Sequence, residues 1–133
     1  MKYVYPAVFY PESDGRFSVI FPDLNNLATY GDNLADAFAM AQDACEQYLF
    51  TLLRDGDPLP EATTLGAVVK DEPDALVNLI CADLDAYSRA YDDHAVKKTL
   101  SIPAWLNTIC DGYGINYSKV LKDALIAKLQ TQS

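Results

Sequence analysis

The feature that most constrains the fold is the last third of the chain, where residues 96–129 combine one short strand pattern with two helix patterns. Residues 96–102 alternate in polarity, which places Leu100 and Ile102 on one face of a strand. Pro103 ends this strand. Its fixed φ and its lack of an N–H suit the first position of a helix, so a helix is expected to begin there. A single strand leaves both backbone edges unpaired, so this segment cannot form a stable unit alone.

Two helices are predicted after this proline. The first ends at Gly112 and Gly114, and Asn116 then stands where the N-cap of the second helix belongs. The second helix runs nearly to the end of the chain. Helical spacing is kept by the apolar residues Leu106, Ile109, Cys110 and Tyr113 in the first helix and Val120, Leu121, Ala124, Leu125 and Leu129 in the second.

A second copy of the chain could supply the missing strand partner. Two antiparallel copies of residues 96–102 would form a two-stranded ribbon, a shape that fits the major groove of B-DNA. The alternation then directs Lys97, Thr99 and Ser101 towards the base edges. We therefore expect a dimeric ribbon-helix-helix DNA-binding module. The alternative is a strand and helix pair that merely completes a globular fold.

The remaining residues of this module are expected to pack or to contact phosphate. Trp105 is interpreted as a packing residue beside the strand rather than a base-stacking one, because its large ring anchors a small core. Tyr117, Ser118 and Lys119 are expected to contact a DNA phosphate at the start of the second helix. The expected dimer core consists of Leu100, Ile102, Trp105, Leu106, Ile109, Leu121 and Leu125.

The net charge of −9 is distributed unevenly along the chain. Residues 1–95 hold five Lys or Arg against seventeen Asp or Glu, a net charge of −12, whereas residues 96–133 hold five Lys against two Asp, a net charge of +3. A basic module can approach phosphate, whereas an acidic body repels nucleic acid and suits a basic protein partner. An acidic body alone would indicate only solubility; beside a basic module it favours a basic partner.

The body is predicted to have the order β-β-β-α-β, so the fold class is α+β. Asp32 or Asn33 caps the helix, which ends near Arg54 and Gly56. Pro6 should lie at an edge, a bulge or a position without a ladder hydrogen bond. The strands are expected at residues 3–10, 16–21, 27–30 and 75–82, and the apolar stripe of the helix at Leu34, Phe38, Ala41, Cys45, Tyr48, Leu49 and Leu52.

The segments after the helix set the expected domain boundaries. Residues 58–73 contain turn residues without periodicity, and the continuous apolar run at residues 75–82 indicates a central strand. Residues 83–95 are polar, and their later half is interpreted as a hinge. The expected domains are therefore a body at 1–87, a linker at 88–95 and the DNA-binding module at 96–133.

Several stretches resemble the HicB antitoxins of bacterial toxin–antitoxin pairs. The resemblance covers nearly the whole chain, and its most specific combination is FPDL, a short strand, then GD before an amphipathic helix. The ribbon-helix-helix half alone is shared with many repressors. The stretches are YPAVFY, DGRFSVIFPDL, TYGDNLADAFAMAQDACEQYL, DGDPLPE and KKTLSIPAWLNTICDGYGINYSKVLKDALIAKL.

This resemblance implies a fold and a function for each part. The body would have a partial RNase H-like fold and would bind and mask a small basic HicA-like toxin, an mRNA-cleaving ribonuclease. The tail would bind double-stranded operator DNA, as a dimer or a tetramer, and repress its own operon. HicB tails are of the ribbon-helix-helix or the helix-turn-helix kind, and the stretch SIPAWL favours the first.

Catalytic activity is not expected from the sequence. An RNase H-type site needs acidic side chains from the first strand to hold two metal ions, and residues 2–10 contain no Asp or Glu. His94, the single histidine, has no neighbouring pattern that would make it a base or a metal ligand. There is no P-loop and no GxGxxG motif. We therefore expect no catalytic residue, no cofactor and no metal; Asp36, Asp43, Glu46, Asp83 and Asp85 are interpreted as solvated charges.

The remaining expectations concern compartment and alternative functions. Cys45, Cys81 and Cys110 are odd in number and far apart, so they are interpreted as buried hydrophobic residues of a reducing compartment, without a disulfide or zinc. A signal peptide and a membrane-spanning run are not evident, which favours the cytoplasm. The alternatives are a ribbon-helix-helix regulator whose acidic domain senses a small ligand, and a degenerate nuclease with metal-dependent activity.

Overall fold

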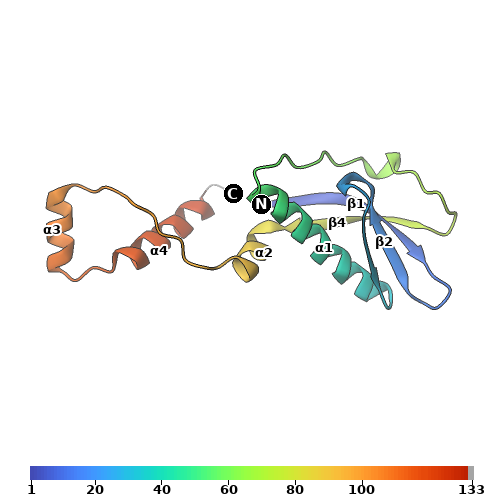
Figure 1. Ribbon diagram of the computed structural model, residues 1–133, viewed down its shortest axis with the longest axis horizontal. Coiled ribbons are helices and arrows are strands. Elements are labelled where there is room, and N and C mark those ends of the chain that lie inside the picture. The colour runs from blue at the N-terminus through green and yellow to red at the C-terminus, as the bar shows by residue number, and fades with distance from the viewer. Residues whose placement is uncertain (132–133) are drawn as a thin grey trace. The chain divides into compact units, whose positions relative to one another are not determined.

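The computed structural model describes residues 1–131, which form two units (Figure 1). The first unit is Met1–His94, and the second begins at Ala95. Within the described residues, the chain is an α+β protein with a four-stranded antiparallel sheet and four α-helices. The first unit contains the sheet, α1 (Leu34–Arg54) and α2 (Leu84–Tyr91). The second contains α3 (Ala104–Gly112) and α4 (Tyr117–Gln130).

The sheet has the strand order β3-β2-β1-β4, and every neighbouring pair is antiparallel. The predicted order β-β-β-α-β is confirmed for the part of the chain up to β4. Registers such as Phe9 opposite Val19, and Phe21 opposite Leu27, align the apolar positions of adjacent strands on one face. The strands are β1 (Lys2–Pro11), β2 (Phe17–Phe21), β3 (Leu27–Gly31) and β4 (Leu76–Asp83).

The prediction that β4 is a central strand is wrong, because β4 lies at an edge and pairs with β1 alone. Its apolar run is divided between two environments. Ile80 and Ala82 are buried against the core, whereas Leu79 is 46% exposed and Cys81 is exposed. An uninterrupted apolar run therefore does not require burial of both faces.

Side chains form hydrogen bonds with backbone groups on the free edge of β4. The amide of Leu79 donates to Asn78 Oδ1 at 2.8 Å, and the amide of Asp83 donates to Glu46 Oε2 at 2.7 Å. Gln42 Nε2 donates to the carbonyl of Cys81 at 3.3 Å. Edge backbone groups bonded in this way are less available to another strand.

Pro6 lies in β1 opposite Leu79, and the amide of Leu79 points away from β1. Pro6 and Leu79 therefore form a pair without ladder hydrogen bonds between β1 and β4. The ring nitrogen of Pro6 faces the β2 side of β1, where strand pairing begins only at Val8. A residue without an N–H is tolerated there. The expectation for Pro6 is confirmed.

Asn33 rather than Asp32 is the N-cap of α1. Its side chain accepts a hydrogen bond from the amide of Asp36 at 2.9 Å, and the Asp36 carboxylate accepts one from the amide of Asp32 at 2.9 Å. These reciprocal bonds satisfy donors at the beginning of the helix. Gly31 precedes this cap, and a Cβ there would lie 2.2 Å from the backbone nitrogen of Ala37, so the close approach of β3 to α1 requires glycine.

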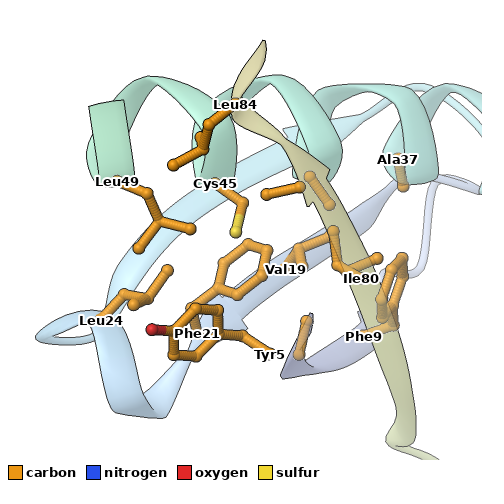
Figure 2. Packing of buried hydrophobic residues seen from close by; sticks show 13 residues of the cluster. Tyr5, Phe9, Val19, Phe21, Leu24, Ala37, Cys45, Leu49, Ile80 and Leu84 are labelled. Carbon is orange, nitrogen blue, oxygen red and sulfur yellow. The ribbon is translucent and has the colours of Figure 1, made fainter. Parts of the chain in front are cut away.

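The core lies between α1 and one face of the sheet (Figure 2). The helix buries small and medium residues at four-residue steps, so it can lie close to the strands. Leu34, expected in the buried stripe, is 41% exposed, whereas Ala37 is fully buried. The buried residues of α1 are Ala37, Ala41, Cys45 and Leu49, and they face Tyr5, Phe9, Val19, Phe21, Leu24, Ile80 and Leu84.

The segment between α1 and β4, expected to be irregular, contains one short 3-10 turn at Leu65–Ala67. It is attached to the rest of the unit by hydrogen bonds. The Tyr5 hydroxyl donates to the Pro60 carbonyl at 2.5 Å, and Thr63 donates to Asp23 through both its amide, at 2.8 Å, and its hydroxyl, at 2.6 Å. The segment is therefore fixed without strand pairing.

The helix α2 was not expected from the polar composition of residues 83–95. Asp83 caps it by accepting a hydrogen bond from the amide of Ala86 at 3.1 Å. The ring of Tyr87 lies 5.4 Å from that of Phe50 in α1, which packs α2 against the longer helix. The body boundary expected at residue 87 therefore falls within a helix.

The second unit shows no strand at residues 96–102, where one was expected. A strand is defined by hydrogen bonds to a neighbour, and no other strand lies within the described part of this unit. Pro103 precedes α3 as its flanking residue rather than being its first helical residue. The expected stop at Gly112 and the N-cap at Asn116 are confirmed.

Candidate functional site

No residue between Ala95 and Thr131 is buried in the single chain. Trp105 is 65% exposed, Leu100 60% and Ile102 47%. This unit therefore presents apolar side chains to solvent instead of burying them. The other members of the expected dimer core behave in the same way: Ile109, Leu121 and Leu125 are exposed, and Leu106 is half-buried.

The expected base-reading residues lie in the irregular segment before α3. Lys97, Thr99 and Ser101 are all exposed, and none of their side chains has a hydrogen bond or ion pair within residues 1–131. Because Leu100 and Ile102 are exposed as well, burial does not distinguish the two faces of this segment. The assignment of these three residues stays a prediction.

The beginning of α4 is partly satisfied by its own residues. Asn116 Oδ1 accepts a hydrogen bond from the amide of Lys119 at 3.1 Å. The Lys119 ammonium lies 3.1 Å from Asp123 Oδ2, one turn along the helix. Both side chains of this pair are mostly exposed, and exposed pairs contribute little to stability. The phosphate contact expected of Lys119 stays a prediction.

Tyr117 was expected to contact phosphate, but the structure engages its hydroxyl inside the unit. The hydroxyl donates to Asp111 Oδ1 at 2.6 Å and lies 3.2 Å from the carbonyl of Asn107. The hydrogen bond to Asp111 raises the pKa of Tyr117 to about 12. These contacts join the end of α3 to the beginning of α4. Asp111 was missed as a partner because sequence spacing does not show which residues a turn brings together.

The body carries a hollow on the sheet face opposite α1, which we call the outer hollow. Its volume is about 500 Å³, and its lining includes Glu12, Asp14, Arg16, Ile20, Ala28 and Tyr30. Residues 17, 19 and 21 of β2 point to the core, so the intervening residues of β2 and their partners in β3 face the other way. Carboxylates and an aromatic ring thus border an open part of the sheet.

Arg16 lies among these groups. Its Nε atom is 3.6 Å from Asp14 Oδ2 and 3.8 Å from Asp32 Oδ1, and its guanidinium carbon lies 5.9 Å from the centre of the Tyr30 ring. The remaining carboxylate, Glu12, accepts a hydrogen bond from the Ser18 hydroxyl at 2.9 Å. The outer hollow is therefore an environment in which a guanidinium is already held by acidic and aromatic neighbours.

Three of the acidic residues considered for catalysis have structural partners. Asp36 accepts a hydrogen bond from the amide of Asp32, Asp83 caps α2, and Glu46 accepts a hydrogen bond from the edge of β4. Among residues 1–131, no group of three or more His, Cys, Asp or Glu side chains could hold a metal ion. His94 Nδ1 lies 3.2 Å from Asp92 Oδ1 at an exposed position.

The three cysteines differ in exposure. Cys45 is buried, as expected, and burial raises the pKa of its thiol to about 12, with smaller contributions from Glu46 and Cys81. The expectation of burial is wrong for Cys81, which is exposed on the outer face of the edge strand, and Cys110 is half-buried. None of the helices described between residues 1 and 131 is long and apolar enough to cross a membrane.

Comparison with known proteins gives a consistent result. A family model described as HicB-like antitoxin of bacterial toxin–antitoxin system matches residues 5–129. A toxin–antitoxin complex from Streptococcus pneumoniae matches with 26% identity and a TM-score of 0.62, over 96% of this chain and 99% of that chain. No curated protein sequence matches the chain.

Two further solved structures share the fold at lower identity. The antitoxin HicB of Burkholderia pseudomallei matches with 20% identity and a TM-score of 0.54, over 98% of each chain. A HicA3 and HicB3 toxin–antitoxin complex matches with 23% identity and a TM-score of 0.50, over 61% of this chain and 99% of that chain.

Proposed function

Because the chain belongs to the family of HicB-like antitoxins of bacterial toxin–antitoxin systems, we propose that its body, Met1–His94, binds and neutralises a small basic toxin of the HicA kind. The observation that carries this proposal is the family match over residues 5–129. The similarity to a toxin–antitoxin complex from Streptococcus pneumoniae supports a toxin as the partner.

The charge of the body fits such a partner. With a net charge of −12 over residues 1–95, it attracts a basic protein and repels nucleic acid. Neutralisation then requires only that the bound antitoxin prevents the toxin from reaching RNA. We infer a non-enzymatic role for the body, and a partial RNase H-like fold remains our interpretation of its β-β-β-α-β order.

The second unit is proposed to form a ribbon-helix-helix dimer that binds operator DNA and represses its own operon. The exposed apolar residues of α3, α4 and the preceding segment support this proposal, because a unit with no buried residue needs a partner to form a core. Pairing of residues 96–102 from two copies would supply the strand contacts that one chain lacks. The net charge of +3 over residues 96–133 suits a phosphate backbone.

Co-purification tests the antitoxin function. The full chain is expressed with a small basic toxin of the HicA kind, sought first among the products of the neighbouring genes, and the complex is isolated through a tag on either component. We expect the two to purify together and the antitoxin to stop RNA cleavage by the isolated partner. A folded chain that neither binds nor inhibits this protein would contradict the proposal.

A further inference from the structure

The outer hollow lies where the sheet has no helix to cover it. Ile20 in β2 and Ala28 in β3 are cross-strand partners on this face, and Tyr30 follows two residues later with 59% of its surface exposed. Ala28 is exposed and Ile20 half-buried. An exposed part of a sheet face that carries apolar and aromatic residues is a surface on which another protein can dock.

Charge distinguishes this hollow from two others beside α1. The lining of the hollow between α1 and β3 contains no charged residue, and neither does the lining of the hollow between α1 and β4. The first is lined by Leu27, Ala28, Thr29, Ala44, Gln47, Tyr48, Thr51 and Leu52. The outer hollow has Glu12 and Asp14 in its lining, and Asp32 reaches its single cation, Arg16. It therefore combines an apolar floor with excess negative charge.

The position of Arg16 indicates which chemical group the hollow suits. Its guanidinium is placed near two carboxylates and over an aromatic ring, an arrangement that stabilises arginine through charge and through the ring. Glu12 is bonded only to a neutral hydroxyl in this arrangement, so it keeps its full charge for another cation.

We propose that the outer hollow is the surface on which the basic toxin docks, with a lysine or arginine of the toxin entering between Glu12 and Tyr30. The inference rests on the proposed antitoxin function and adds the location of the interface. A basic partner fits because its lysine or arginine would neutralise Glu12 and Asp14. Apolar residues of the toxin beside that cation would cover Ile20 and Ala28. The capped edge of β4 and the helix-covered face of the sheet offer no comparable surface.

A pair of matched variants of the full chain tests the location. Ala28→Arg places a large cation in the hollow, and Met40→Arg places the same charge on the exposed surface of α1. Affinity for the basic toxin that co-purifies with the wild-type chain is measured by isothermal titration calorimetry, with circular dichroism as the control for folding. We expect Ala28→Arg to weaken binding by roughly a hundredfold and Met40→Arg by less than about threefold.

A second pair of variants keeps the test decisive if Ala28→Arg does not fold. Glu12→Gln with Asp14→Asn removes two charges from the hollow and keeps the side-chain shapes, whereas Glu72→Gln with Asp74→Asn removes two charges elsewhere. We expect the first pair to lower the association rate roughly tenfold at low salt and the second to lower it much less. Equal effects of the two pairs would overturn the proposed location. If the wild-type chain itself does not bind, the antitoxin function fails, which is a different result.

Discussion

The Tyr117 hydroxyl donates a hydrogen bond to Asp111 Oδ1 at 2.6 Å, so the first residue of α4 is fastened to the last turn of α3. The turn between them contains Gly114 at φ 66° and Asn116, whose side chain caps α4. The angle between the two helices therefore depends on a side-chain contact as well as on the backbone of the turn.

This contact should be visible as a pH dependence. The pKa of Tyr117 is raised to about 12 by its bond to Asp111, whereas a free tyrosine ionises near pH 10. The stabilisation is then fully present below about pH 10 and is lost as the pH rises towards 12. Absorbance titrations of wild type and Tyr117→Phe should differ by one tyrosine that ionises late, because the pKa values of Tyr5, Tyr10 and Tyr87 are raised in both proteins. Identical late phases in both proteins would contradict the contact.

The approach of β3 to α1 makes a specific prediction about two glycines. Gly31→Ala would place a Cβ 2.2 Å from the backbone of Ala37, and backbone cannot move as a flexible side chain does. We expect destabilisation of about 1 to 3 kcal/mol or more. Gly66→Ala is the control, because a Cβ there meets nothing within 4 Å. Urea denaturation of both variants provides the comparison, and equal midpoints would contradict the packing.

The different environments of two cysteines predict different reactivity. Cys45 is buried and the pKa of its thiol is raised to about 12, whereas Cys81 is exposed on β4. A thiol reagent at neutral pH should modify Cys81 in the native protein and Cys45 only after unfolding. Mass spectrometry of the peptides identifies the modified residue. Rapid modification of Cys45 in folded protein would show that the helix does not cover it.

The proposed DNA-binding unit can be tested by the alternation of its first residues. Replacing Lys97, Thr99 and Ser101 together by Ala should abolish specific operator binding, because a good contact to a base edge contributes about 1 to 3 kcal/mol of discrimination. Lys98→Ala is the control from the other face. Fluorescence anisotropy with operator DNA measures the loss, and toxin inhibition should be unchanged. Unchanged specificity in the triple variant would exclude this segment as the reading element.

The apolar surface of the same unit predicts its association. Leu100 is 60% exposed in the single chain, and in a dimer core its replacement by Ala should cost roughly 2 to 5 kcal/mol. Sedimentation velocity should then show dissociation of the Leu100→Ala variant but not of Lys128→Ala, near the end of α4. A dimer that withstands the substitution would place the interface elsewhere.

Local patterns were sufficient to predict the order of elements along the chain up to β4, the long helix with a cap at Asp32 or Asn33, and the cap at Asn116. The edge position of β4 in the sheet was not predictable, because an apolar run does not indicate whether a strand pairs with one neighbour or with two. The helix α2 was hidden by its polar composition, since its stability comes from the Asp83 cap and from Tyr87 against Phe50. Both features depend on tertiary contacts, which the periodicity of the sequence does not show.

For the candidate site, the sequence predicted the sign of the charge on each part of the chain but not which side chains lie together. Charge counts predicted an acidic body and a basic tail, but not that Glu12, Asp14 and Arg16 gather on one uncovered face. For Tyr117, the residue type and its place at the beginning of a helix predicted a phosphate contact. In the structure its hydroxyl donates a hydrogen bond to Asp111 instead. Which side chains meet depends on strand register and turn geometry.

Neutralisation by the acidic body is tested most directly by an RNA-cleavage assay with the basic toxin of the HicA kind that co-purifies with the chain. The chain with residues 1–133 is added in increasing amounts, and cleavage is measured at low and high salt. We expect cleavage to fall to background with excess antitoxin and association to slow as salt rises. A folded chain that leaves cleavage unchanged at every ratio would show that the acidic body does not neutralise the toxin.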